Sequence, residues 1–267
     1  MSADDRLQRL ADALAGARRS GQVLPMAPWL GVLRDADEAY AVQDLVAAAL
    51  GWFGGALPRF WKSGGPSRQA ALTHAGLPPA GVQAVAGGQT ASLAGQHFHR
   101  RGIEAEVALR LRRDVTAREV AAWAAGQVPP ASELVDAMTV AIEVVDTRWA
   151  PPTPQAPDVA WLKLADQQSH GALVLGEWRA FDERDWSHQR CELRIGDAPP
   201  RSFEGTHPLG DPAWLLPLWL GHATRGGGTV PAGTAVSTGS WSGLGDAAPG
   251  DRVELDFADL GALALQF

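Results

Sequence analysis

Apolar residues recur at helical spacing through the first fifty positions of the chain. The first helix is expected to start near Ser2 and to end at Gly16 or Gly21. Its apolar residues Leu7, Leu10, Ala11 and Leu14 share one helical face. A second helix is predicted over residues 37–50, and Gly51 is the residue expected to stop it. The chain therefore begins with two amphipathic helices.

After this start the pattern changes to one typical of strands. Residues 103–111 alternate apolar and polar side chains, which predicts a half-buried strand. The β-branched run over residues 140–146 predicts another strand. Further strands are expected at residues 160–164, 172–176, 189–195, 235–238, 252–257 and 260–267.

Short helices interrupt these strands. Thr116 and Glu119 have the spacing of a capping box for a helix that reaches about residue 125, and Ser132 can open another helix. Asp211 followed by proline predicts a helix to about residue 224, and four prolines make residues 150–158 a loop. The pattern predicts an α+β chain with a helical N-terminal cap, residues 1–58, and a β-rich body, residues 59–267.

Composition excludes several classes of protein. The 267 residues carry a net charge of -7, which argues against nucleic acid or an anionic membrane as the main partner. The longest apolar stretch, residues 45–57, is broken by glycines and is too short to cross a bilayer. A lone cysteine, Cys191, and an acidic start without a secretory signal favour a cytoplasmic protein.

Glu104 and Glu106 are the strongest local sign of chemistry. Two residues apart on a strand, they point to one face, where paired carboxylates repel each other unless a cation or a proton lies between them. Glu143 is a third acid in an otherwise apolar strand, where burial of an unpaired charge is costly. The three either form an oxygen site for a divalent ion or face water on an exposed sheet and an edge strand.

Lys62 lies between bulky aromatic residues and a glycine turn. Partial desolvation there would suit a lysine for proton transfer, although a solvated surface lysine fits the same pattern. No acid occurs from Leu45 to Ile103, while that stretch holds five cationic residues, a local reversal of charge that suits an anionic substrate. A scattered basic surface is the alternative.

Other candidate sites are weaker. His97 and His99 could ligate zinc from one strand face, but no cysteine or third histidine lies near them in sequence. Ser240 follows a glycine but lacks the Gly-x-Ser-x-Gly pattern of a serine hydrolase. The glycines at residues 226–228 lack the lysine of a phosphate loop, so they indicate only a loop.

Several motifs follow one another along the chain. They are Tyr40-Ala41-Val42-Gln43, Trp61-Lys62-x-Gly64, Ile103-Glu104-Ala105-Glu106, Ala141-Ile142-Glu143-Val144-Val145-Asp146, Ala165-Asp166 with Ser169, His207-Pro208 with Ala213-Trp214-Leu215, and Thr238-Gly239. In this order they resemble the hydratase/decarboxylase branch of the fumarylacetoacetate hydrolase superfamily, which includes 2-oxopent-4-enoate hydratase and 4-oxalocrotonate decarboxylase. The resemblance extends from about residue 36 to the C-terminus.

The resemblance implies a distorted mixed β-roll or β-sandwich body and a substrate with a 2-oxo acid end. By position, the metal ligands for Mg²⁺ or Mn²⁺ would be Glu104, Glu106 and Glu143. The same carry-over makes Lys62 the general acid/base, and it places Asp166, Ser169, Thr238 and Gly239 around the substrate.

The sequence also departs from the family's pattern. Gly65-Pro66 stand where members have Leu-Thr, and the family's Asp-Asn-x-Ser-Ser is Asp166-Gln167-Gln168-Ser169-His170. The acid usual about twenty residues after the lysine motif is missing. Lys163 resembles a lysine of the acylpyruvate-cleaving branch, where it could supply a second cation, or it is a surface group.

The resulting hypothesis is a metal-dependent hydro-lyase that hydrates a 2-hydroxypenta-2,4-dienoate-like acid in aromatic-compound catabolism. Decarboxylation of an oxalocrotonate-like acid and hydrolysis of an acylpyruvate carbon–carbon bond are the alternative reactions. A different class of function is a non-catalytic partner subunit of an active homologue. A homo-oligomer is expected, with a related decarboxylase or hydratase as a further candidate partner.

Overall fold

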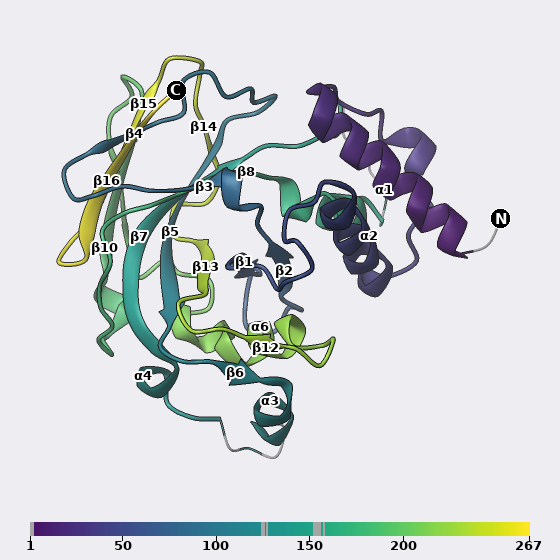
Figure 1. The fold of residues 1–267 in the computed structure, drawn as a ribbon. Coiled ribbons are helices and arrows are strands. Elements are labelled where there is room, and N and C mark those ends of the chain that lie inside the picture. The colour runs from purple at the N-terminus through teal and green to yellow at the C-terminus, as the bar shows by residue number, and fades with distance from the viewer. Residues whose placement is uncertain (1–2, 124–125, 127, 152–155, 157) are drawn as a thin grey trace.

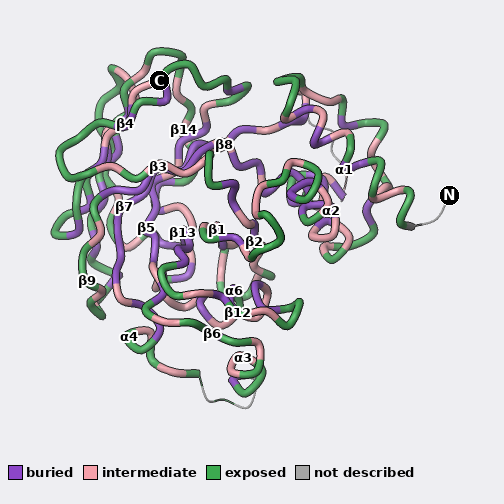
Figure 2. Tube along the Cα trace, viewed as in Figure 1, coloured by how far each residue is buried: buried purple, intermediate pink, exposed green. Residues whose placement is uncertain are grey.

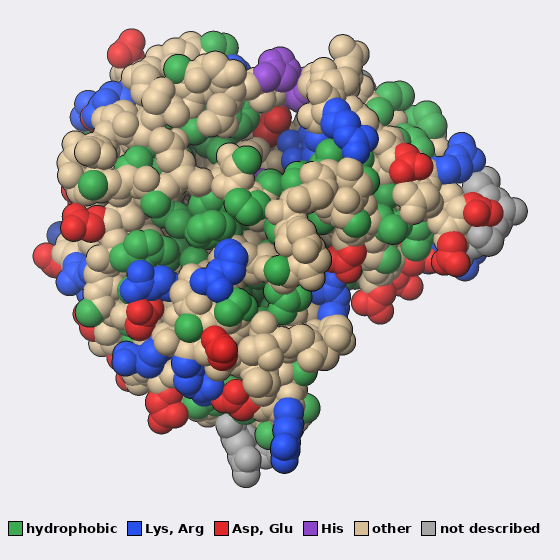
Figure 3. Space-filling view, in the orientation of Figure 1, with side chains coloured by type: hydrophobic (Ala, Val, Ile, Leu, Met, Phe, Trp, Pro, Cys, Tyr) green, Lys and Arg blue, Asp and Glu red, His purple; other side chains and the backbone are tan. Residues whose placement is uncertain are grey.

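The computed structural model describes residues 3–123, 126, 128–151, 156 and 158–267. Figure 1 shows a group of N-terminal helices beside a body of curled sheets, with the N-terminus at the far side of the helices. On the face drawn in Figure 3, acidic and basic side chains are interspersed over both parts. In the part of the chain that the structure describes, no helix is long and apolar enough to span a bilayer. The α+β class predicted from the sequence is confirmed.

The two N-terminal helices form where the apolar spacing predicts them. Helix α1 spans Ala3–Ser20 and helix α2 spans Ala36–Ala49. Gly21, with a φ of +65°, follows the end of α1, so Gly16 does not end this helix. The side chain of Asp35 caps α2 by accepting a hydrogen bond from the backbone N–H of Glu38.

One predicted strand is wrong. Residues 160–164 lie in helix α5, Val159–Ala165, because Leu162, Leu164 and Ala165 of this short apolar run pack against α1 and α2. The remaining helices are short: α3 (Ala117–Trp123), α4 (Ala131–Leu134) and α6 (Leu216–Ala223), with the 3₁₀ turns η1 (Ala27–Trp29), η2 (Pro79–Gly81), η3 (Gln167–Ser169), η4 (Trp186–His188) and η5 (Pro212–Leu215).

The larger sheet is built around two long antiparallel strands, β5 (Gly102–Leu111) and β7 (Val135–Val145). Its order is β2-β1-β13-β5-β7-β8-β3, with β14 also paired to β5 and β9 to β7. The other strands are β1 (Phe60–Gly64), β2 (Thr73–Gly76), β3 (Val82–Ala84), β8 (His170–Leu175), β9 (Arg179–Ala180), β13 (Ala235–Ser240) and β14 (Gly245–Asp246).

The prediction that residues 103–111 form a half-buried strand is wrong in its burial. Strand β5 lies between β13 and β7 in the middle of the sheet, and eight of its ten residues are buried, while Glu104 and Arg110 are partly exposed. Glu104 and Glu106 therefore do not face open water. Their face of the sheet holds the candidate site described below.

A second sheet covers the opposite face of the first. It has the order β11-β10-β15-β16-β4, and the main core lies between the two sheets, including Ile142, Leu193, Trp241 and Leu255. The strands are β4 (Thr90–Ser92), β10 (Arg190–Ile195), β11 (Arg201–Glu204), β15 (Arg252–Phe257) and β16 (Gly261–Gln266), while β6 (Val115–Thr116) pairs with β12 (Thr229–Val230).

A separate apolar core joins the N-terminal helices to α5. Leu10 and Leu14 of α1 and Val46 of α2 are fully buried there with Leu162 of α5. Figure 2 shows the buried positions of α1 and α2 turned toward the rest of the molecule. Most of the loop predicted at residues 150–158, and the predicted end of a helix near residue 125, lie outside the described residues.

Candidate metal and active site

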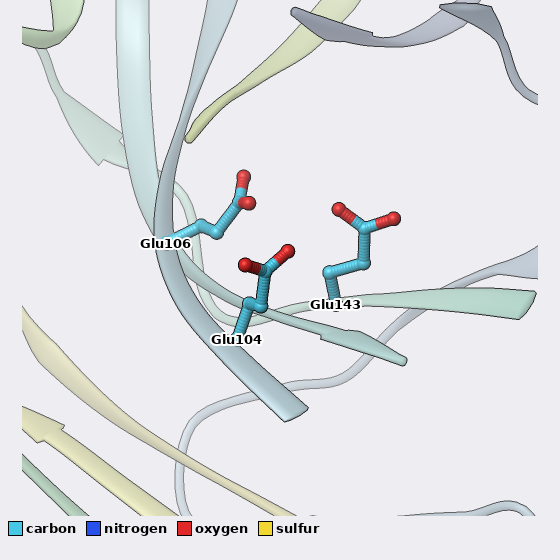
Figure 4. Close-up of side chains that lie close together, drawn as sticks. All are labelled: Glu104, Glu106 and Glu143. Atoms are coloured by element: carbon cyan, nitrogen blue, oxygen red, sulfur yellow. The ribbon is translucent and has the colours of Figure 1, made fainter. Parts of the chain in front are cut away.

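Three glutamates from two neighbouring strands meet on one face of the larger sheet. Glu104 and Glu106 of β5 point to the same side, and Glu143 of β7 is the direct cross-strand partner of Glu104. One carboxylate oxygen from each lies within 4.8 Å of the others. Figure 4 shows the three carboxylates directed into the same space. The sheet register thus assembles the cluster that the sequence could only suggest.

Glu106 is buried, with 3% of its surface exposed. Its Oε2 accepts hydrogen bonds from the Ser237 hydroxyl and from the Gly239 backbone N–H, the latter at 3.1 Å. Burial, together with the charges of Glu143 and Glu104, raises the pKa of Glu106 to about 8. The same two effects, burial and the charge of Glu143, raise the pKa of Glu104.

Glu143 is paired with a lysine. Its Oε1 accepts a hydrogen bond from Lys62 Nζ on β1, and Nζ also donates to the backbone oxygen of Gln168 at 3.2 Å. Burial opposes the charge of both groups, but their attraction outweighs it: the pKa of Glu143 is lowered and the pKa of Lys62 is raised. Both side chains are therefore charged in this arrangement.

The donor set fits a hard divalent cation. Three carboxylates supply only oxygen ligands, the preference of Mg²⁺ and Mn²⁺. Among the described residues, the second oxygen of Glu143 is buried with no hydrogen-bond partner. Burial and the neighbouring carboxylate charges raise the pKa values of Glu104 and Glu106, so full ionisation of the cluster leaves excess negative charge without a further cation. A divalent cation would satisfy both the unpartnered oxygen and the excess charge.

The cluster opens into a cleft. An inner cavity of about 350 Å³ is lined by the three glutamates, Lys62 and the turn containing Gly65. An outer cavity of about 440 Å³ shares Lys62, Thr73, Glu104 and Gln168 with it, so the two adjoin each other. Together they can accommodate a small molecule whose one end reaches the carboxylates.

Two of the other predicted residues line the outer cavity. Ser169 is buried on η3, where residues 167–169 all have positive φ values between 46° and 58°. Three successive non-glycine residues in this region store backbone strain of a kind that gathers at functional sites. Lys163 of α5 is exposed at the outer cavity.

The side chains of Asp166 and Thr238 line neither of these two cavities and are hydrogen-bonded inside the protein. Asp166 is fully buried, and its carboxylate accepts hydrogen bonds from Arg18 at 3.0 Å and from Arg148 Nε at 2.7 Å. The Thr238 hydroxyl donates to the backbone oxygen of Val107 at 2.7 Å. Gly239 lines the inner cavity and holds Glu106 with its backbone N–H, at a φ of +106°.

Sequence reasoning assigned no role to four polar groups around the cluster. Ser237 donates to Glu106, and Gln168 links Lys62 to the Thr73 hydroxyl through its backbone oxygen and its side-chain amide. His170, noted only as a departure from the family pattern, is fully buried with Nδ1 3.9 Å from Glu143 Oε1. Burial lowers the pKa of His170 to about 4. Only strand pairing could have revealed these contacts.

The alternative zinc site gains no support. His97 and His99 are exposed and their rings lie 4.7 Å apart, edge to face. Within the described part of the chain, the residues close enough together to hold one ion are Glu104, Glu106 and Glu143. Neither histidine belongs to this group.

The family follows from a direct match. Residues 78–267 match the model of the fumarylacetoacetate (FAA) hydrolase C-terminal family, which covers most of the chain. The chain belongs to this family. The match confirms the resemblance noted in the sequence. A search of curated protein sequences gave no match.

Solved structures extend the likeness of fold over the whole chain. Two structures of 4-oxalocrotonate decarboxylase from Pseudomonas putida G7, one with calcium and acetate and one with magnesium and adipate, each have a TM-score of 0.77. Each is 17% identical and covers 100% of this chain and 99% of its own. A 2-hydroxyhepta-2,4-diene-1,7-dioate isomerase from Mycobacterium marinum matches 78% of this chain and 74% of its own at 15% identity, with a TM-score of 0.52.

Proposed function

We propose that this protein is a metal-dependent lyase that acts on a 2-oxo acid or its 2-hydroxy-2,4-dienoate form, and that hydration of a 2-hydroxypenta-2,4-dienoate-like acid is its reaction. The observation that carries the proposal is the cluster of Glu104, Glu106 and Glu143 facing Lys62 at the inner end of one cleft. The 4-oxalocrotonate decarboxylase structures of this fold, complexed with calcium and acetate or with magnesium and adipate, support a divalent cation here.

Glu104, Glu106 and Glu143 would hold Mg²⁺ or Mn²⁺. When bound, such an ion supplies a Lewis acid that stabilises negative charge developing on the 2-oxygen of the substrate. Ser237 and the Gly239 N–H fix the carboxylate of Glu106, so this ligand is oriented before a cation arrives.

Lys62 would move the proton. Its ammonium lies at the boundary between the inner and outer cavities, and its raised pKa keeps it protonated before substrate binds. It can donate to the carbon chain of the dienol and regain a proton from the 2-hydroxyl, which gives a 2-oxo-3-enoate. Water then adds across that double bond, with its hydroxyl on C4 and a proton on C3.

Decarboxylation of an oxalocrotonate-like diacid is the second candidate, and Lys163 favours it. This exposed lysine lines the outer cavity, which Glu104 also lines but Glu106 and Glu143 do not, and there it would attract a second substrate carboxylate. Arg100 lines the same cavity but is paired with Asp246 at 2.8 Å, so its charge is already balanced.

A substrate panel separates the two reactions. Enzyme with Mg²⁺ or Mn²⁺ is mixed with the monocarboxylic dienoate, with the diacid and with an acylpyruvate, and the reaction is followed by ultraviolet absorbance and product mass. Hydration adds the mass of one water, whereas decarboxylation removes that of carbon dioxide. The proposal expects turnover of one of the first two substrates that stops in EDTA; turnover that persists without metal contradicts it.

A further inference from the structure

A histidine lies behind the carboxylate cluster, outside the cleft. His170 begins β8, is fully buried, and its Nδ1 is 3.9 Å from Oε1 of Glu143. Among the described residues, both of its ring nitrogens and Glu143 Oε2 are buried without a hydrogen-bond partner. Buried polar atoms are nearly always hydrogen-bonded, so this pair of neighbouring exceptions requires an explanation.

The backbone turns His170 toward Glu143. Along β7 and β8, Val144 pairs with Ala172, but the next pair is Val145 with His170, so Gly171 is an extra residue in the ladder. Because side chains alternate along a strand, this bulge moves His170 to the face that carries Val145 and Glu143. In a regular ladder Gly171 would hold that position instead.

Two glycines make room for this placement. A Cβ at Gly171 would lie 2.7 Å from the backbone oxygen of Val144, so only glycine fits the bulge. A Cβ at Gly81 would lie 2.8 Å from Nε2 of His170, so the imidazole packs directly against the backbone of η2. The ring is thus held between η2 and Glu143.

We propose that His170 is a positioning residue for Glu143: its ring N–H restrains the carboxylate for metal binding, whether or not Lys62 also holds it. Lys62 cannot both move a proton and hold Glu143 without interruption. His170 reaches Glu143 from the protein side, whereas Lys62 reaches it from the cleft. Partners behind metal ligands of this kind contribute about 10–100-fold to metal affinity. This inference rests on the metal site of the proposed function.

The test is Mn²⁺ affinity, measured by calorimetry without substrate. His170→Phe keeps a ring but removes its N–H groups, and His170→Asn returns an N–H donor near the place of Nδ1. His222→Phe is the matched control, since His222 is a histidine in a ring cluster with Tyr40 and outside the cleft. Thermal melts establish that each variant is folded at the titration temperature.

The inference expects Mn²⁺ binding about 10–100-fold weaker in His170→Phe and within about threefold of wild type in His170→Asn and His222→Phe. Wild-type affinity in His170→Phe would overturn it, as would His170→Asn binding no better than His170→Phe. Neither of these results would count against metal binding by the three glutamates. Absence of Mn²⁺ binding by the wild-type protein would instead overturn the proposed function, and this inference with it.

Discussion

At the scale of single residues, the charge at the three glutamates is partly balanced by the ammonium of Lys62. Its Nζ donates to Glu143, and its charge also acts on Glu104 and Glu106. A divalent cation at the same carboxylates would be repelled by this ammonium. Lys62 therefore has opposite effects on the two functions proposed for the site: it is needed for proton transfer, and it opposes metal binding.

Replacing Lys62 by methionine should separate these effects. Lys62→Met keeps the length of the side chain but removes the proton and the charge, so kcat should fall by about 10²–10⁴. Mn²⁺ affinity should stay equal or increase, since a neighbouring positive charge has gone. Steady-state kinetics and calorimetry on one preparation test both effects. Loss of Mn²⁺ binding in a folded variant would contradict this account of Lys62.

At the scale of elements, helix α2 depends on acids near its start. Asp35 caps it, while Glu38 binds Arg6 of α1 at 2.5–2.9 Å and accepts from the backbone N–H of Arg34 at 2.9 Å. The hydrogen bond from Arg6 is the main cause of the lowered pKa of Glu38. This contact fastens α2 to α1 at the edge of their shared core.

The ion pair between Arg6 and Glu38 is expected to make a pH-dependent contribution to stability. Because the pKa of Glu38 is lowered in the fold, its contribution is complete above the unfolded value and is lost as the pH falls through the folded value. Glu38→Gln should lower the free energy of unfolding by about 1 kcal/mol at pH 7. Urea unfolding of both proteins at pH 7 and near pH 3 tests this; a difference that persists at the lower pH would count against the ion pair.

The elements also show how far the sequence could predict the site. Period-two spacing placed Glu104 and Glu106 on one face, and helical spacing predicted α1 and α2. The pairing of Glu143 with Glu104 is a matter of strand register, which no local pattern specifies. The apolar run over residues 160–164 fits either a strand or a buried helix, and only packing against α1 and α2 selects the helix.

At the scale of the whole molecule, a buried ion network joins the N-terminal helices to the body. Asp166 lies between Arg18 of α1 and Arg148, which follows β7, and it precedes the strained η3 turn. The network therefore ties α1 to the segment that supplies Gln168 and Ser169 to the cleft. The family resemblance alone assigned Asp166 only a role in substrate binding.

Asp166→Asn tests this connection. Removing Asp166 from the buried network leaves Asp146 to face both Arg18 and Arg148, so the free energy of unfolding should fall by about 3–5 kcal/mol. Asp182→Asn is the control: it breaks a half-exposed pair with Arg184 and should cost less than about 1 kcal/mol. Denaturant unfolding gives both values. Equal stability of the two variants would contradict a structural role for Asp166.

The central claim is that the three glutamates bind a divalent cation that is shared with a 2-oxo acid. The most direct measurement is a calorimetric Mn²⁺ titration with and without oxalate, which mimics the acid end of such a substrate. It is made on the wild type, on Glu106→Gln, and on Glu192→Gln, which changes an exposed acid of β10. We predict that oxalate tightens Mn²⁺ binding in the wild type and in Glu192→Gln, and that Glu106→Gln loses this binding. A folded wild-type protein that binds neither Mn²⁺ nor oxalate would contradict the account.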